Sequence, residues 1–202
     1  MNLISHLFLG FISAFIGLLG PGMLNMTAVR TTIEQGKKAG VVFSLGAISV
    51  VLVQASMALF FANFIIKNPK ILDNLRVAAI IVFFMLAVFF FIQARKKSVV
   101  KGKIKKGNLF VIGVVMSSLN MLAIPFYFGV STYFKVNGQL NMELPYIFLF
   151  VIGSVLGSFS VFLLYIYFAG IINQKAKFIA TNINYILSGL FIALGIIAFL
   201  KS

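Results

Sequence analysis

The chain has 202 residues, of which 61% are hydrophobic and only 10% are charged, and its net charge is +14. A soluble domain is about 45–50% apolar and about 25% charged, so this composition indicates a membrane protein, and the length indicates one domain. The cations lie between apolar runs, where they orient a membrane protein and contact anionic lipid, so we expect no nucleic-acid partner. Cysteine is absent, which excludes disulfides and thiolate metal sites.

Six apolar stretches are candidates to cross a bilayer, whose core of about 30 Å requires roughly 20 helical residues. The expected spans cover approximately residues 3–19, 40–66, 77–92, 109–134, 145–172 and 179–200. These runs lack the polar alternation of barrel strands, so the sequence predicts an all-α membrane protein with six transmembrane helices.

A short phrase recurs in the two halves of the chain. The pattern L-N-M-x-A occupies residues 24–28, after the first span, and residues 119–123, inside the fourth. This recurrence predicts two three-helix repeats at 1–94 and 109–202, joined by a basic cytoplasmic linker at 95–108. An odd number of spans inverts the second copy, and inverted repeats with interrupted helices are typical of secondary transporters.

The connections between spans predict the orientation. Loops one, three and five carry twelve of the seventeen Lys and Arg residues, and the opposite side carries five. Positive charge is enriched in cytoplasmic loops, so loops one, three and five are expected inside and both termini outside. We therefore expect a multi-pass protein of the cytoplasmic (inner) membrane.

Ionisable groups are scarce within the expected spans. Glu34, Asp73 and Glu143 fall in loops or at span ends, and His6 is the only histidine, expected at the membrane interface. Metal-dependent membrane enzymes need clustered His or carboxylate ligands, so we expect no enzyme, metal or cofactor. The same scarcity argues against a simple proton relay through buried carboxylates.

The segment Gly20-Pro21-Gly22, followed by Asn25, is the most suggestive local feature. Proline lacks an N–H and glycine tolerates unusual dihedral angles, so the segment can end a helix and free backbone groups beside a cavity. The alternative is a plain helix end with a turn into loop one. The similar Asn120 and Pro125 inside the fourth span favour the first interpretation, because polar groups at membrane depth are costly unless they are satisfied.

Two further patterns lie within spans. Gln54 stands near the middle of span two, where its amide needs a partner from another helix or from a ligand. Gly153-x-x-x-Gly157 in span five predicts close helix packing. The residues expected to bind a solute are Gly20, Pro21, Gly22, Asn25, Gln54, Asn120 and Pro125, with the two asparagines lining one cavity.

The first half of the chain resembles the lysine-exporter (LysE-type) family of amino-acid translocators. The resemblance is carried by Pro21-Gly22, by Q-G-K-K-A-G at 35–40, and by Gly46. The chain has Met23 where the family motif P-G-P has its second proline, and Ala47 where an acidic residue is often found. The resemblance implies export of amino acids or similar small metabolites, driven by the proton-motive force.

The sequence alone is therefore consistent with two functions. The first is an inverted-repeat exporter of a small solute such as an amino acid, with its cavity between the repeats. The second is a non-transporting membrane accessory or lipid-handling protein, which the missing buried carboxylate favours. The sequence does not identify the substrate or the coupling ion, and it leaves open whether the chain forms a homodimer.

Overall fold

The computed structural model describes residues 3–68, 107–120 and 122–172, together with residues 84, 87–88, 91–92, 188–189, 192 and 196. The chain divides by its contacts into two compact units, Met1–Phe64 with Ile104–Gln174 and Ile65–Lys103 with Lys175–Ser202. The described elements are helices, which confirms the all-α prediction for these residues. The expected spans at 77–92 and 179–200 lie largely outside the described residues.

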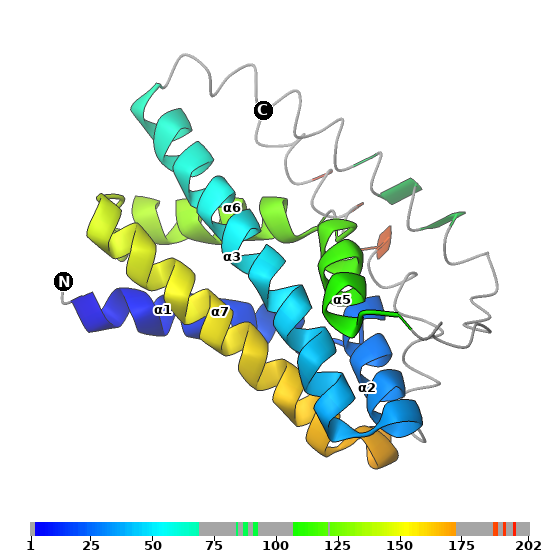
Figure 1. Ribbon diagram of the computed structural model, residues 1–202. Coiled ribbons are helices and arrows are strands. Elements are labelled where there is room, and N and C mark those ends of the chain that lie inside the picture. Colours follow the sequence, from blue (N-terminus) through cyan, green and yellow to red (C-terminus); the bar gives the residue numbers. More distant parts are fainter. Residues whose placement is uncertain are drawn as a thin grey trace. The chain divides into compact units, whose positions relative to one another are not determined.

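The described helices run in a simple order along the chain. They are α1 (Leu3–Leu18), α2 (Met23–Gln35), α3 (Lys37–Lys67), α5 (Leu109–Ser118), α6 (Ala123–Val136) and α7 (Leu144–Tyr167). Figure 1 labels these helices along the ribbon. All of them belong to the first unit, apart from the last residues of α3. The expected first, second and fifth spans agree with α1, α3 and α7 to within a few residues at most ends.

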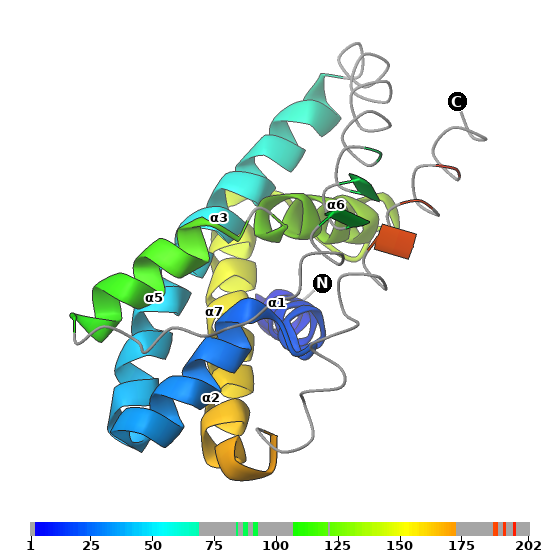
Figure 2. The same ribbon diagram turned by 90° about the vertical axis from the view of Figure 1, so that its right-hand side faces the viewer.

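Four segments of the described chain are candidates to cross a membrane. α3 and α7 are long and apolar enough by themselves, and the pairs α1–α2 and α5–α6 each qualify if a bent pair forms one span. The chain bends by 77° between α1 and α2 and by 62° between α5 and α6. Both bends are visible in the second view of the ribbon (Figure 2).

Two features of these segments were not predicted from the sequence. The fourth expected span, 109–134, corresponds to the bent pair α5–α6, with an interruption between the two helices. Most of loop one is the helix α2, which packs the apolar residues Leu24, Ala28 and Val29 into the protein. Hydropathy alone cannot predict either feature, because an interruption can leave an apolar run unchanged and tertiary packing can stabilise a helix of mixed polarity.

The helix α3 concentrates its alanines on one face. Its buried face carries alanine at positions 47, 55, 58 and 62, together with larger residues such as Phe43 and Leu59. Its exposed face carries large apolar residues, among them Leu52, Met57, Phe60 and Phe64. Small residues at helix contacts and large apolar residues outside are expected where the surrounding solvent is lipid.

Glycines bring two pairs of helices into backbone contact. Gly10 of α1 lies against the carbonyl of Phe150 in α7, and Gly153 and Gly157 of α7 lie against backbone atoms of α1. Gly46 of α3 lies against the carbonyl of Phe110 in α5. The prediction that the Gly153–Gly157 pair packs closely against another helix is therefore confirmed, and Figure 1 shows α7 crossing α1.

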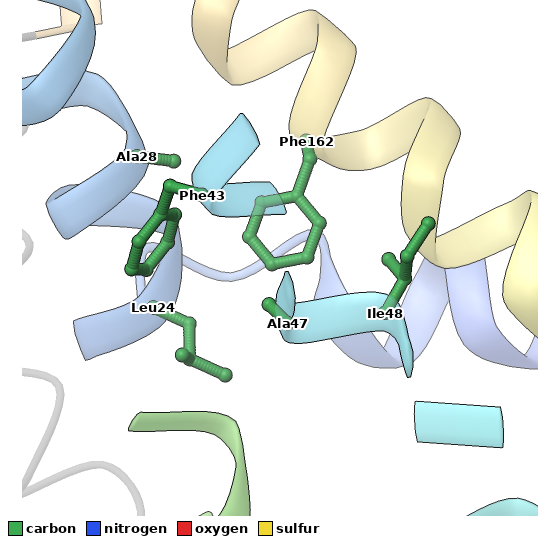
Figure 3. Close-up of a cluster of buried hydrophobic side chains, with 6 residues drawn as sticks. All are labelled: Leu24, Ala28, Phe43, Ala47, Ile48 and Phe162. Carbon is green, nitrogen blue, oxygen red and sulfur yellow. The ribbon is translucent and has the colours of Figure 1, made fainter. Parts of the chain in front are cut away.

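A cluster of six buried apolar side chains joins α2, α3 and α7. Leu24 and Ala28 come from α2, and Phe162 comes from α7. They meet three residues of α3, namely Phe43, Ala47 and Ile48 (Figure 3). Leu18 and Met116, at the ends of α1 and α5, pack against the same cluster, so the two interrupted helices share one core.

Tight connections hold the ends of these helices. Gly36 alone separates α2 from α3, and its φ of 91° is a conformation that favours glycine. The connection from α6 to α7 is held by His6, whose Nε2 accepts a hydrogen bond from the backbone N–H of Asn141 at 3.0 Å. His6 is fully buried within the protein, with its ring centroid 4.5 Å from that of Tyr146, and its place at the membrane interface stays a prediction.

The second unit is described at a few positions. The Ser188 hydroxyl donates a hydrogen bond to the carbonyl of Ala87 at 3.0 Å, and both residues are buried. A groove of about 410 Å³ is lined by Phe84, Ala87, Val88, Phe91, Ser188 and Ile192. Its lining is almost entirely apolar, as expected for helices that face lipid.

Candidate functional site

The interruption between α1 and α2 is caused by Pro21. Proline has no N–H to donate to the carbonyl four residues earlier, and its ring would clash with that carbonyl in a continuous helix. Gly22 does not use the conformational freedom of glycine here, since it has an ordinary extended conformation with φ −81°. Among the described residues, positive φ angles occur only at Gly36 and Gly138. An added Cβ at Gly20 would meet no atom within 4 Å.

Asn25 folds back onto the end of α1. Its Nδ2 donates hydrogen bonds to the carbonyls of Leu18, at 2.6 Å, and Gly20, at 2.9 Å. The residue is 2% exposed, and no donor among the described residues reaches its Oδ1. Asn25 therefore satisfies two carbonyls that the interruption frees, and it keeps one buried acceptor unused.

Tyr165 of α7 closes the same interruption from the other half of the chain. Its hydroxyl donates a hydrogen bond to the carbonyl of Leu19 at 2.8 Å. The carbonyls of Leu18, Leu19 and Gly20 are thus all bound by side chains. We expected these backbone groups to be free beside a cavity; in this conformation they are capped.

The second interruption, between α5 and α6, is capped in a comparable way. Gln54 of α3 donates from Nε2 to the carbonyl of Ser117 at 3.2 Å. The backbone N–H of Asn120 donates to the same carbonyl at 3.0 Å. Pro125 lies in the first turn of α6, where a helix has no intrahelical acceptor for an N–H, so proline is tolerated there.

Two polar atoms remain without a partner at this second interruption. No described residue donates to Gln54 Oε1, and none bonds to the hydroxyl of Ser117. Gln54 is 7% exposed and Ser117 is fully buried. Buried polar atoms are usually satisfied, so such a pair requires an explanation.

The recurring phrase does not mark equivalent positions in the two halves. The last residues of α1 and α5 are 100 positions apart, and so are the first residues of α2 and α6. The phrase, in contrast, recurs after 95 positions. Asn25 is the third residue of α2, while Asn120 lies in the interruption itself. By position relative to the interruption, Asn25 corresponds to Pro125 and Asn120 corresponds to Gly20.

The caps and the helix contacts nevertheless follow one scheme. α1 packs on α7, which supplies Tyr165 to its interruption; α5 packs on α3, which supplies Gln54. In each case the cap comes from the long helix of the other half. This exchange relates α1 to α5 and α3 to α7, as an internal repeat would.

The predicted residues thus fall into two groups. Gly20, Pro21, Gly22 and Asn25 gather at the first interruption, and Gln54 and Asn120 meet at the second beside Pro125. Tyr165 and Ser117 were not among the residues predicted from the sequence to bind a solute. Each is a polar residue within an expected span, which is the feature that could have identified it. Nothing in the sequence distinguished these two residues from polar residues that serve helix packing.

Charged chemistry is absent from both interruptions in the described part of the chain. Glu34, at the end of α2, pairs with Arg30 at 2.7 Å, and Glu143 precedes α7. Within the described residues there is no group of three His, Cys, Asp or Glu side chains that could hold a metal. The arrangement can bind through carbonyls, amides and hydroxyls, which suits a polar solute or a small cation.

Comparisons with known proteins give one family. The model of the LysE type translocator family matches residues 15–202. No curated protein and no solved structure gives a significant match.

Proposed function

Because the chain belongs to the LysE type translocator family, a family of membrane translocators for amino acids or related compounds, we propose that it is a secondary transporter. In this proposal it exports amino acids or similar small metabolites across the cytoplasmic membrane by proton-coupled alternating access. The chain is a multi-pass membrane protein, and the proposed orientation places both termini outside.

One observation supports this proposal most strongly. Two interrupted helices, α1–α2 and α5–α6, are each capped by a side chain from the long helix of the other half of the chain. Interrupted helices at the interface of inverted repeats form the binding sites of many secondary transporters. In the proposal, residues 1–94 and 109–202 are such repeats, and the solute binds between the two interruptions.

The division into compact units agrees with this scheme. The first unit takes the first two expected spans from each half, and the second unit takes the last expected span from each half. A division that treats both halves alike is what two copies of one folding unit would produce. Relative movement of such units is a common basis of alternating access.

The experiment restores a continuous first helix with the double substitution Pro21→Ala and Gly22→Ala. Alanine fits at Gly22, where an added Cβ would meet only the Gly20 carbonyl, at 4.0 Å, and it is the best helix former. Efflux of radiolabelled amino acids from loaded proteoliposomes should fall sharply, because the helix end can no longer present its backbone groups.

Two controls make the result interpretable. Pro145→Ala changes a proline at the start of α7, outside either interruption, and should leave efflux unchanged. An uncoupler that collapses the proton gradient should reduce efflux by the unmodified protein. If the double variant inserts normally and exports at the original rate, the interrupted-helix site is wrong; if only the uncoupler has no effect, proton coupling is wrong and export stands.

A lipid-handling function is favoured by one specific feature, an open groove of about 330 Å³ between α1 and α6. It is lined by Ile12, Ser13, Ile16, Phe126, Gly129, Val130, Tyr133 and Phe134. An apolar groove of this kind accepts an acyl chain rather than an amino acid. Gly129→Leu, which fills the groove, should impair a lipid-handling protein and leave an amino-acid exporter active.

A further inference from the structure

Ser117 and Ser158 differ from most serines of the described helices, because their buried hydroxyls have no described partner. The hydroxyls of Ser13, Ser44, Ser118 and Ser160 each donate to the carbonyl four residues earlier in their own helix. This local bond is the usual way for a helical serine to satisfy its hydroxyl at membrane depth. Ser117 makes no such bond although it is fully buried, so its hydroxyl remains available to a partner from outside the helix.

Gln54 brings a second available oxygen to the same place. Its Nε2 is fixed on the Ser117 carbonyl, and the amide geometry keeps Oε1 next to that nitrogen. Oε1 therefore lies near the end of α5, close to the Ser117 residue whose hydroxyl is also unbonded. Two buried oxygens without described partners, one from α3 and one from α5, thus lie near the same interruption.

The chemistry of this pair selects the kind of ligand. Gln54 Oε1 can only accept, the Ser117 hydroxyl can accept as well as donate, and one N–H of the Gln54 amide is already bound to the Ser117 carbonyl. The pair also lies at the C-terminal end of the ten-residue helix α5, where the helix dipole is negative and favours cations. An anion could accept one hydrogen bond from the Ser117 hydroxyl, but the negative end of the α5 dipole would disfavour it.

We propose that Gln54 and Ser117 form a subsite for a compact cation, which is either the ammonium group of a solute or an alkali ion. The proposal rests on the transport function proposed above and assigns one chemical group to its site. Because the pair is buried, the cation reaches it when α6 moves relative to α5 about the interruption. Asn25 Oδ1, also buried and without a described donor, offers a comparable acceptor at the first interruption.

The test uses Ser117→Ala, which removes the hydroxyl but keeps the backbone carbonyl that Gln54 caps. The matched control is Ser118→Ala, because the neighbouring Ser118 hydroxyl is already bonded to the Val114 carbonyl at 2.9 Å. Since the Ser117 hydroxyl has no described partner, its removal should not lower the thermal midpoint of the protein without added salt. A Gln54→Leu variant removes the second oxygen.

The measurement is the thermal midpoint of the purified full chain in detergent, with chloride salts at constant ionic strength. Methylammonium and sodium are compared with tetramethylammonium, which carries the same charge without N–H donors and is too large for the subsite. We expect methylammonium or sodium to raise the midpoint, since a ligand that binds only the folded form stabilises it. Ser117→Ala should raise the half-saturating concentration about tenfold, as expected for one lost hydrogen bond to a charged group, and Ser118→Ala should not.

A methylammonium response assigns the subsite to the amine of a solute, and a sodium response without it assigns the subsite to a coupling ion. The proposal is overturned if neither salt shifts the unmodified protein, or if Ser117→Ala and Ser118→Ala respond alike. Amino-acid efflux from proteoliposomes, measured on the same preparation, separates the two proposals. If the protein exports amino acids but Ser117→Ala does not change the half-saturating salt concentration, the transport function is supported and this subsite is wrong. If Ser117→Ala changes that concentration but no efflux is measured, the cation subsite is supported and amino-acid export is wrong.

Discussion

The contact between α1 and α7 allows a sharp test of the packing, through the substitution Gly153→Ala. An added Cβ at Gly153 would overlap the Leu7 carbonyl oxygen and lie 2.8 Å from the Leu7 carbonyl carbon and 2.9 Å from the Phe11 nitrogen. These are backbone atoms and cannot rotate away. Ordinary van der Waals contact begins at 3.4 Å, so relieving the contact with the Leu7 carbonyl carbon requires a separation of about 0.6 Å between the two helices at this point.

The expected cost follows from two opposing effects. Overpacking a well-packed contact typically costs about 1–3 kcal/mol. Replacing glycine by alanine within a helix gains about 1 kcal/mol of helix propensity. Gly129→Ala in α6 is the matched control, because an added Cβ there meets nothing within 4 Å and the variant shows the propensity gain alone.

The assay is equilibrium unfolding in mixed detergent micelles, followed by circular dichroism. The free energy of unfolding of Gly153→Ala should lie about 1–3 kcal/mol below that of Gly129→Ala. Gly113→Ala in α5, which faces the Phe43 carbonyl of α3, should behave like Gly153→Ala, because the two helix pairs are built alike. Equal unfolding free energies for Gly153→Ala and Gly129→Ala would refute the close backbone packing of α1 and α7.

Three further predictions concern the caps and the topology. Tyr165→Phe should lower the free energy of unfolding by about 1–3 kcal/mol, because the Leu19 carbonyl loses its buried donor, measured by the same micelle titration. His6→Leu should cost a similar amount, since the ring no longer accepts from the α6–α7 connection, and proteolysis should cut that connection faster. Single cysteines introduced at Ser98 and Asn137 should react with impermeant thiol reagents from opposite sides of the membrane.

Each of these has its own check. Tyr167→Phe, at an exposed position on α7, should leave the free energy of unfolding unchanged, and a loss equal to that of Tyr165→Phe would remove the specific role of the cap. Wild-type proteolysis rates in the His6→Leu variant would show that the ring does not hold the connection. Labelling of both introduced cysteines from outside would contradict the expected topology.

The sequence predicted where the first helix ends, because Pro21 acts locally through its ring and its missing N–H. It did not predict that α2 follows as a helix, since that segment mixes threonines with apolar residues. What stabilises α2 is Leu24 and Ala28 packed against Phe43 and Phe162, residues distant in the chain. Local propensity carries no information about such contacts.

The candidate site could also be predicted only in part, because its contacts join residues that are distant in the chain. Gln54 was identified because an amide within an apolar span needs a partner. That partner is the Ser117 carbonyl, 63 residues away, which only the folded arrangement of α3 and α5 brings within reach. The recurring asparagine phrase pointed to the right two regions but to positions that differ by five residues relative to the interruptions.

The single-residue turn between α2 and α3 has a mechanical consequence. Gly36 donates to the Thr32 carbonyl, and Gly40 of α3 packs directly on the Thr32 side chain, so the corner is braced on both sides. A turn held in this way should keep the angle between α2 and α3 fixed, so that the two helices move as one rigid body. Any tilt of α3 would then move α2 with it and change the bend of the chain at Pro21. This movement would pull Asn25 away from the α1 carbonyls to which it donates hydrogen bonds.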